Sequence, residues 1–117
     1  MAGFLEYVTI NLPNILQHPY IVEQVELNGN LYFFEFAWNI RHEKVYLSIF
    51  TKKDNEDYYY VRNICLVNGI EISKHIYDTD WSGKLFFAQI ENLDETEYRV
   101  DNFHTDFCIN YFADEDE

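Results

Sequence analysis

The side chains best suited to catalysis or metal binding are four histidines, two cysteines and three serines. Their spacing matches no catalytic motif. No histidine belongs to an HxH or HExxH pattern, which would place two imidazoles on one metal ion. Cys65 and Cys108 lie far apart between apolar neighbours, which is typical of buried, reduced thiols. No serine has the context of a nucleophile elbow, and no Gly-rich phosphate loop is present. The residues are His18, His42, His75, His104, Cys65, Cys108, Ser48, Ser73 and Ser82.

Two groups of acidic residues could be interpreted as metal-binding or catalytic sites. Asp78 and Asp80 have the alternating oxygens of a calcium loop, but the later ligands and the central glycine of an EF-hand are missing. His104 lies near Asp101 and Asp106, yet such groupings arise by chance when 21 of 117 residues are acidic. No pair of carboxylates is singled out for glycosidic chemistry. We therefore expect no catalytic residue, no metal site, no cofactor and no enzymatic activity.

Composition narrows the class of protein further. The chain has the length of one domain, 19% of its residues are aromatic, and its formal charge is −13. The aromatic content excludes a disordered chain, and the shortage of Lys and Arg excludes stable binding to DNA phosphates. Apolar runs are too short to span a membrane, and no signal peptide is visible. We expect a soluble, membrane-free protein that is made in a cytosol.

Alternating apolar and polar residues indicate strands along most of the chain. Phe34, Phe36 and Trp38 share one face of a strand, and Asn28-Gly29 before it is a strong hairpin signal. A charged loop is expected over residues 52–57, and a short helix over 13–18. The sequence predicts an all-β fold, a small antiparallel β-sandwich or partly open barrel with little helix. Strands are expected over 20–27, 32–38, 45–50, 58–67, 70–76, 84–90 and 107–112.

The chain divides into three parts. Residues 1–23 form an N-terminal segment that is either an extra strand or an arm, since Val8–Leu12 alternates like a strand. Residues 24–112 form the β-sandwich domain, and residues 113–117 form an acidic C-terminal tail. Alternation cannot bury all of Tyr58, Tyr59 and Tyr60, so at least one ring must face solvent or a partner.

Several short runs resemble the small baseplate plug or cap proteins of contractile-tailed bacteriophages. They are Gln24-Val25-Glu26-Leu27-Asn28-Gly29, Trp38-Asn39-Ile40-Arg41, Asn63 to Gly69, Ser82-Gly83-Lys84-Leu85 and Tyr98 to Phe112. Their order and spacing match the family over residues 24–112. The chain departs from it in having His104 where the family has Gly, a longer N-terminal segment and more acidic residues. The positions that match family motifs are Leu27, Gly29, Trp38, Asn39, Arg41, Gly69, Gly83, Leu85 and Tyr111.

The resemblance implies a virion structural protein, made in the host cytoplasm and built into the phage tail. Such plugs sit at the tip of the tail tube around the hub, join the tube to the baseplate and have no enzymatic activity. Implied partners are the hub, the tail tube and neighbouring copies in a homo-oligomeric ring. Aromatic side chains dominate many protein interfaces. The candidate interface residues are Tyr58, Tyr59, Tyr60, Trp81 and Phe103.

Two alternatives remain open at this level. An acidic phage-encoded inhibitor that mimics nucleic acid suits the charge of −13, although the acidic clusters near 54–57, 91–97 and 114–117 are spread along the chain. A small sugar-binding β-sandwich would use Trp81 and the three consecutive tyrosines as stacking platforms.

Overall fold

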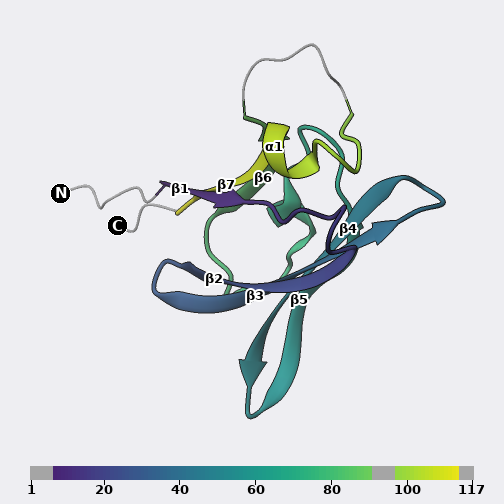
Figure 1. Ribbon diagram of the computed structural model, residues 1–117. Coiled ribbons are helices and arrows are strands. Elements are labelled where there is room, and N and C mark those ends of the chain that lie inside the picture. Colours follow the sequence, from purple (N-terminus) through teal and green to yellow (C-terminus); the bar gives the residue numbers. More distant parts are fainter. Residues whose placement is uncertain (1–6, 91–96, 114–117) are drawn as a thin grey trace.

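The computed structural model describes residues 7–90 and 97–113, which form two antiparallel β-sheets packed against each other (Figure 1). Its elements are β1 (Tyr7–Asn11), β2 (Tyr20–Leu27), β3 (Asn30–Asn39), β4 (Lys44–Lys53), β5 (Glu56–Cys65), the 3-10 helix η1 (Ile72–His75), β6 (Lys84–Gln89), α1 (Phe103–Asp106) and β7 (Phe107–Phe112). The sheets have the strand orders β1-β7-β6 and β2-β3-β4-β5. The predicted all-β sandwich with little helix is confirmed.

Two hairpins of the four-stranded sheet close through tight turns in the left-handed region. Asn28 and Gly29 join β2 to β3 with φ values of 52° and 82°, which confirms the Asn-Gly hairpin. Asp54 and Asn55 join β4 to β5 with φ values of 56° and 66°. The expected charged loop over residues 52–57 is therefore wrong, because Asp and Asn tolerate positive φ and allow the strands to continue almost to each other.

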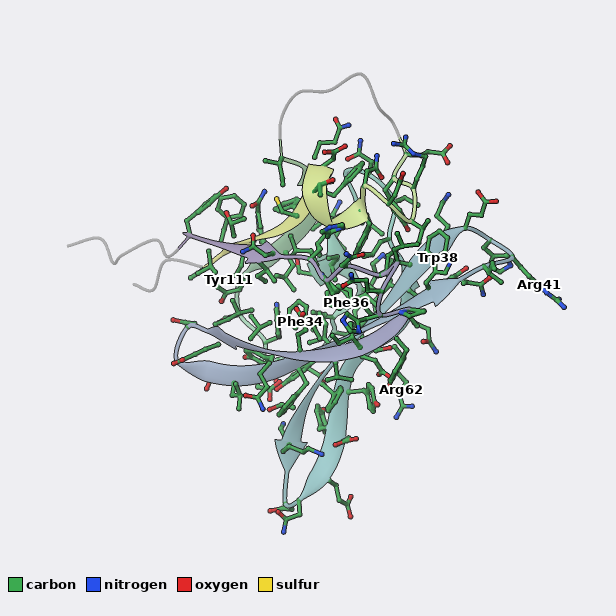
Figure 2. All side chains as sticks on the ribbon, in the orientation of Figure 1. Phe34, Phe36, Trp38, Arg41, Arg62 and Tyr111 are labelled. Carbon is green, nitrogen blue, oxygen red and sulfur yellow. The ribbon has the colours of Figure 1, made fainter. Side chains whose placement is uncertain are left out.

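The core lies between the two sheets and combines aliphatic side chains with a group of packed aromatic rings. Phe34 and Phe36 of β3 have no exposed surface, which confirms the alternation predicted for this strand. From the three-stranded sheet, Phe87 stacks on Phe107 at 5.4 Å, and Tyr111 is 1% exposed. Figure 2 shows Phe34, Phe36 and Tyr111 in the space between the sheets. Such rings bury large apolar areas and contribute much of the packing of this core.

A β-bulge bends the four-stranded sheet at β5. The register between β4 and β5 shifts around Ile49, and Asn63 has a φ of 53°. The backbone N–H of Asn63 donates to the hydroxyl of Ser48 at 2.8 Å, so the bulge keeps its hydrogen bond. Figure 1 shows the far end of the β4–β5 hairpin turning away from the β2–β3 hairpin.

Two further sequence expectations are wrong. Residues 13–18 form a turn rather than a helix, because the Asn14 side chain accepts hydrogen bonds from the N–H groups of Leu16 and Gln17 and Pro19 stops any continuation. The strand expected over residues 70–76 is reduced to one bridge between Glu71 and Phe86, followed by η1.

A serine hydroxyl explains why the chain leaves the sheet at η1. Ser73 accepts the backbone N–H of Leu85 at 3.1 Å, which takes the donor that a further strand beside β6 would need. The N–H of Ile76 then closes the helical turn on the carbonyl of Ser73 at 3.1 Å. The single turn α1, which no sequence pattern indicated, closes similarly from Asp106 back to Asn102.

The N-terminal segment contributes a strand to the sandwich. Residues 7–11 form β1, which pairs antiparallel with β7 so that Ile10 faces Ile109. Both side chains are buried in the core. Residues 1–6 of the segment and 114–117 of the acidic tail lie outside the described residues. An edge strand of the three-stranded sheet, β1, therefore comes from residues that precede the predicted domain of residues 24–112.

Tyr98 ties three segments together through one buried hydroxyl. It accepts the N–H of Val45 and donates to the carbonyl of Leu66, both at 2.7 Å, and burial raises the pKa of the phenol so that it stays protonated. Tyr98→Phe leaves both backbone groups unsatisfied, and we expect a loss of about 1–3 kcal/mol in the free energy of unfolding, measured in urea. Tyr7→Phe, at an exposed hydroxyl, is the control. Equal midpoints for the two variants would contradict this reading.

Candidate interaction surfaces

The chemistry-bearing side chains stay dispersed in the folded chain. His42 is exposed, with Nδ1 2.8 Å from the Tyr46 hydroxyl, and burial raises the pKa of the Cys108 thiol and so weakens it as a nucleophile. Across residues 7–90 and 97–113, no three His, Cys, Asp or Glu side chains gather as a metal site. Over the same residues, the fold holds no helix with the length and apolar character needed to cross a bilayer.

Trp81 is packed into one end of the core. Its ring lies 4.9 Å from that of Tyr32, 5.5 Å from Tyr60 and 6.4 Å from Tyr111, and its indole N–H donates to the carbonyl of Gly83 at 3.1 Å. Neighbouring rings therefore surround it at tilted or edge-on angles. The open stacking platform of a sugar-binding domain does not form at Trp81, and Tyr60 beside it is only 8% exposed.

Tyr58, Lys53 and two aspartates form a polar cluster that joins the β4–β5 hairpin to the loop before β6. The Tyr58 hydroxyl donates to Asp78 at 2.7 Å, and Lys53 Nζ donates to Asp80 at 2.9 Å. Lys53 Nζ also lies 3.9 Å above the Tyr58 ring. The Tyr60 hydroxyl donates to Asp80 at 3.3 Å. These contacts hold the bent hairpin against the loop, and we call them the hairpin latch.

We expect the contribution of the Lys53–Asp80 ion pair to stability to disappear in acid. Hydrogen bonding from Lys53 lowers the pKa of Asp80 from its ordinary 3.8. A carboxyl group with a lower pKa in the folded chain stabilises the fold above its unfolded pKa, and this stabilisation is lost as the pH falls through the folded value. Asp80→Asn should lower the urea midpoint slightly at pH 7, and the difference from wild type should shrink below about pH 4.

The effect is small because the side chains of Lys53 and Asp80 are 45% and 48% exposed. Asp54→Asn, at the exposed turn of the same hairpin, is the control and should match wild type at every pH. A midpoint difference for Asp80→Asn that stays constant down to about pH 3 would show that the ion pair contributes nothing through its charge.

Tyr59 lies on the opposite side of the hairpin, in an aromatic row on the outer face of the four-stranded sheet. The rings of Phe33 and Phe50 stack at 5.1 Å, and Tyr59 follows at 5.0 Å from Phe50. The Arg62 guanidinium lies 4.0 Å from the Tyr59 ring and projects from this side of the molecule (Figure 2). A solvent-facing sheet surface is usually polar, so such a row indicates a face suited to contacts.

Phe103 does not reach the surface. It has no exposed area and packs within 5.1 Å of the Tyr98 ring, 5.8 Å of Phe87 and 6.3 Å of Phe36. The turn of α1 directs it inward, and no strand alternation in the sequence could show this. Phe103 therefore has no surface for a partner in this fold, whereas Tyr58 is 37% exposed. The interface role of the other four aromatic candidates stays a prediction.

Most positions that match the family motifs serve the fold itself. Gly69 and Gly83 have φ values of 87° and 100°, a conformation that favours glycine. Leu27 and Leu85 are fully buried core residues. Three others, Trp38, Asn39 and Arg41, lie at the β3–β4 hairpin, where Arg41 projects away from the body (Figure 2). The motif positions in the core or at turns are Leu27, Gly29, Gly69, Gly83, Leu85 and Tyr111.

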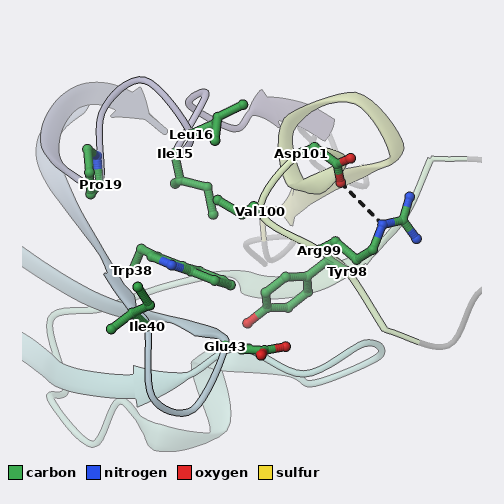
Figure 3. Close-up of a pocket in the computed structure, with 10 residues that line it drawn as sticks. All are labelled: Ile15, Leu16, Pro19, Trp38, Ile40, Glu43, Tyr98, Arg99, Val100 and Asp101. Atoms are coloured by element: carbon green, nitrogen blue, oxygen red, sulfur yellow. Dashed lines mark hydrogen bonds and ion pairs between the residues drawn. The ribbon is translucent and has the colours of Figure 1, made fainter.

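An apolar hollow of about 740 Å³ lies beside this hairpin (Figure 3). Three segments far apart in the sequence form it: the turn after β1, the end of β3 with its hairpin, and the stretch before α1. We call it the Trp38 groove. Its lining consists of Ile15, Leu16, Pro19, Trp38, Ile40, Glu43, Tyr98, Arg99, Val100 and Asp101.

Sequence reasoning missed the Trp38 groove as a surface. It marked Trp38 as part of a motif, but Leu16 and Val100 carry no signal of their own in an aromatic-rich chain. Exposed apolar residues on both sides, Leu16 at 60% and Ile40 at 78%, become meaningful only when the fold places them around one hollow.

Of the acidic clusters that a nucleic-acid mimic would use, 91–96 and 114–117 lie outside the described residues.

Comparison with known protein families finds a match for nearly the whole chain. The family described as cyanophage baseplate Pam3 plug gp18 matches residues 7–115, which include every strand from β1 to β7. Searches of curated proteins and of solved structures found no match. The family match supports a structural role in a phage baseplate, with a place in the tail of the virion. It confirms the resemblance in the sequence motifs: the chain belongs to the family of phage baseplate plug proteins.

Proposed function

We propose that this chain is a plug or cap subunit at the tip of a phage tail tube, where it surrounds the hub and joins the tube to the baseplate. The observation that carries the proposal is the family match over residues 7–115. Because the match includes both sheets, it covers the Trp38 groove and the aromatic outer faces. A subunit that connects neighbours works through such faces and needs no reacting group.

We further propose that neighbouring copies form a ring. Aromatic rows on both outer faces support lateral contacts, because aromatic side chains contribute strongly to interfaces. On the three-stranded sheet, Tyr7 lies 4.8 Å from Phe112, which lies 6.0 Å from Phe86. On the four-stranded sheet, the row contains Phe50 and Tyr59. Two different faces suit the head-to-tail contacts that close a cyclic assembly.

The acidity of the chain fits a position beside the DNA path. With 21 acidic and 8 basic residues, the formal charge is −13, and a wall of this sign repels phosphates. We expect no retardation of linear duplex DNA by the purified protein, even at low salt, where electrostatic attraction would be strongest. A retarded complex that dissociates as salt is added would overturn this part of the proposal.

Disruption of the gene in its phage tests the proposed function. A nonsense mutation placed early in the gene should give particles with defective tail tips and a large loss of infectivity, and a plasmid copy should restore both. Mass spectrometry of purified wild-type particles should detect the protein as a stoichiometric component. Normal infectious particles that lack the protein would contradict a structural role in the baseplate.

A further inference from the structure

We infer that the Trp38 groove is the docking site for a basic segment of another baseplate protein, which inserts large apolar side chains between Leu16 and Ile40. This inference rests on the proposed function, since it takes neighbouring proteins of the tail tip as partners. It goes further by naming the surface and the chemistry of the segment that fits it.

The Trp38 groove is preformed. Ile15 is buried on one wall, and Tyr98 is held by its two hydrogen bonds of 2.7 Å to the backbone of Val45 and Leu66. Figure 3 shows the Trp38 ring extending between Ile15 and Ile40 toward Tyr98. Because its walls are fixed before binding, a partner loses little free energy to ordering this side of the contact. The volume of about 740 Å³ lies in the range of ~300–1,000 Å³ that is usual for ligand clefts.

The rim of the groove is apolar where a free surface would be polar. Ile40 is 78% exposed and Leu16 is 60% exposed, on opposite sides of the hollow. Exposed apolar residues around a hollow are features of a surface that another chain covers.

The Trp-Asn-x-Arg motif builds this side of the groove. Trp38 contributes its ring to the lining, and the Asn39 side chain accepts the backbone N–H of His42 at 2.9 Å, which fixes the turn of the hairpin. The fixed turn places Ile40 on the rim. The Trp-Asn-x-Arg motif, which contributed to the family resemblance, therefore fixes the positions of Trp38 and Ile40 in the groove.

The charges that line the Trp38 groove favour one kind of bound segment. Arg99, the one basic residue of the lining, donates to Asp101 at 3.2 Å, while Glu43 forms no ion pair with any described residue. The lining of the groove therefore has a net negative charge, in a chain of formal charge −13. A second copy would bring the same excess of acid to the contact, whereas a segment with Lys or Arg beside its apolar side chains would be attracted.

Binding of the full-length protein to the purified hub and tail-tube proteins of the same phage tests this inference. We expect one of them to bind, with an affinity that falls as salt rises. Ile40→Asp and Leu16→Asp should each weaken that binding by at least about tenfold, since each introduces a charge into an apolar contact. Glu43→Lys should also weaken it and flatten its salt dependence. Tyr77→Asp is the matched control, because Tyr77 is 86% exposed and lies outside the groove.

The outcomes separate the inference from the proposed function. Wild-type affinity in Ile40→Asp and Leu16→Asp, with unchanged urea midpoints, would overturn the docking site while leaving a baseplate role intact. Loss of self-association in these variants would assign the groove to a second copy and overturn the basic partner. Failure of the wild-type protein to bind either probe would overturn the inference as well. Failure of the proposed function is measured independently, as absence of the protein from purified particles.

Discussion

Phe87→Ala is expected to lower the free energy of unfolding by about 3–5 kcal/mol, the usual loss for a large aromatic ring removed from a packed core. Phe87 has no exposed surface and belongs to the hydrophobic core. Its ring stacks on Phe107 at 5.4 Å and on Phe103 at 5.8 Å, and it meets the edge of Tyr98 at 5.5 Å. The cavity left by alanine removes all three ring contacts at once.

The neighbouring residue supplies a matched control for this substitution. Phe86 lies in the same strand, but its side chain points to the outer face of the sheet, where it is half-buried beside Phe112. Phe86→Ala should therefore cost much less than Phe87→Ala in urea or thermal unfolding. Since domains of this kind are stable by only about 5–15 kcal/mol, Phe87→Leu provides a milder variant should the alanine variant fail to fold. Equal losses at positions 86 and 87 would contradict the described packing.

Gly83→Ala is expected to cost about 2–5 kcal/mol, from backbone strain and steric overlap together. Gly83 has a φ of 100°, and a Cβ built there would lie 2.5 Å from the hydroxyl oxygen of Tyr111 and 2.6 Å from its Cζ. Tyr111 has no room to retreat, because it is 1% exposed and its hydroxyl donates to the carbonyl of Ser82 at 3.0 Å. The Tyr111 ring therefore fits in its place only because residue 83 has no side chain.

Gly29→Ala isolates the backbone contribution. Gly29 also has a positive φ, 82°, but nothing lies within 4 Å of a Cβ built there. Its alanine variant should lose only about 1–2 kcal/mol, the cost of the left-handed conformation. The difference between the two urea midpoints then measures the overlap with Tyr111. If Gly29→Ala costs as much as Gly83→Ala, the close approach at Gly83 contributes nothing.

The strands of the sandwich could be predicted from sequence because their signals are local. The alternation of Phe34 and Phe36 and the turn at Asn28-Gly29 each depend on a few adjacent residues. One of the failures depends on a contact between segments that are separated in sequence. Ser73 accepts a hydrogen bond from Leu85, twelve residues on, and thereby ends a strand that its own neighbourhood favours.

The candidate surfaces were predictable only in part. The sequence required that Tyr58, Tyr59 and Tyr60 could not all be buried. It could not assign their faces, because the register between β4 and β5 shifts between Tyr59 and Val61. It also could not show that α1 turns Phe103 inward. The Trp38 groove needs three segments to meet, and no single segment carries a pattern for it.

A reconstruction of the assembled tail tip by cryo-electron microscopy tests the central claim most directly. We expect density for several copies of this sandwich at the tip of the tail tube, around the hub, with apolar side chains of another chain in the groove beside Trp38. Density for every tube, hub and baseplate protein with no copy of this sandwich among them would contradict the claim that the chain is a baseplate plug.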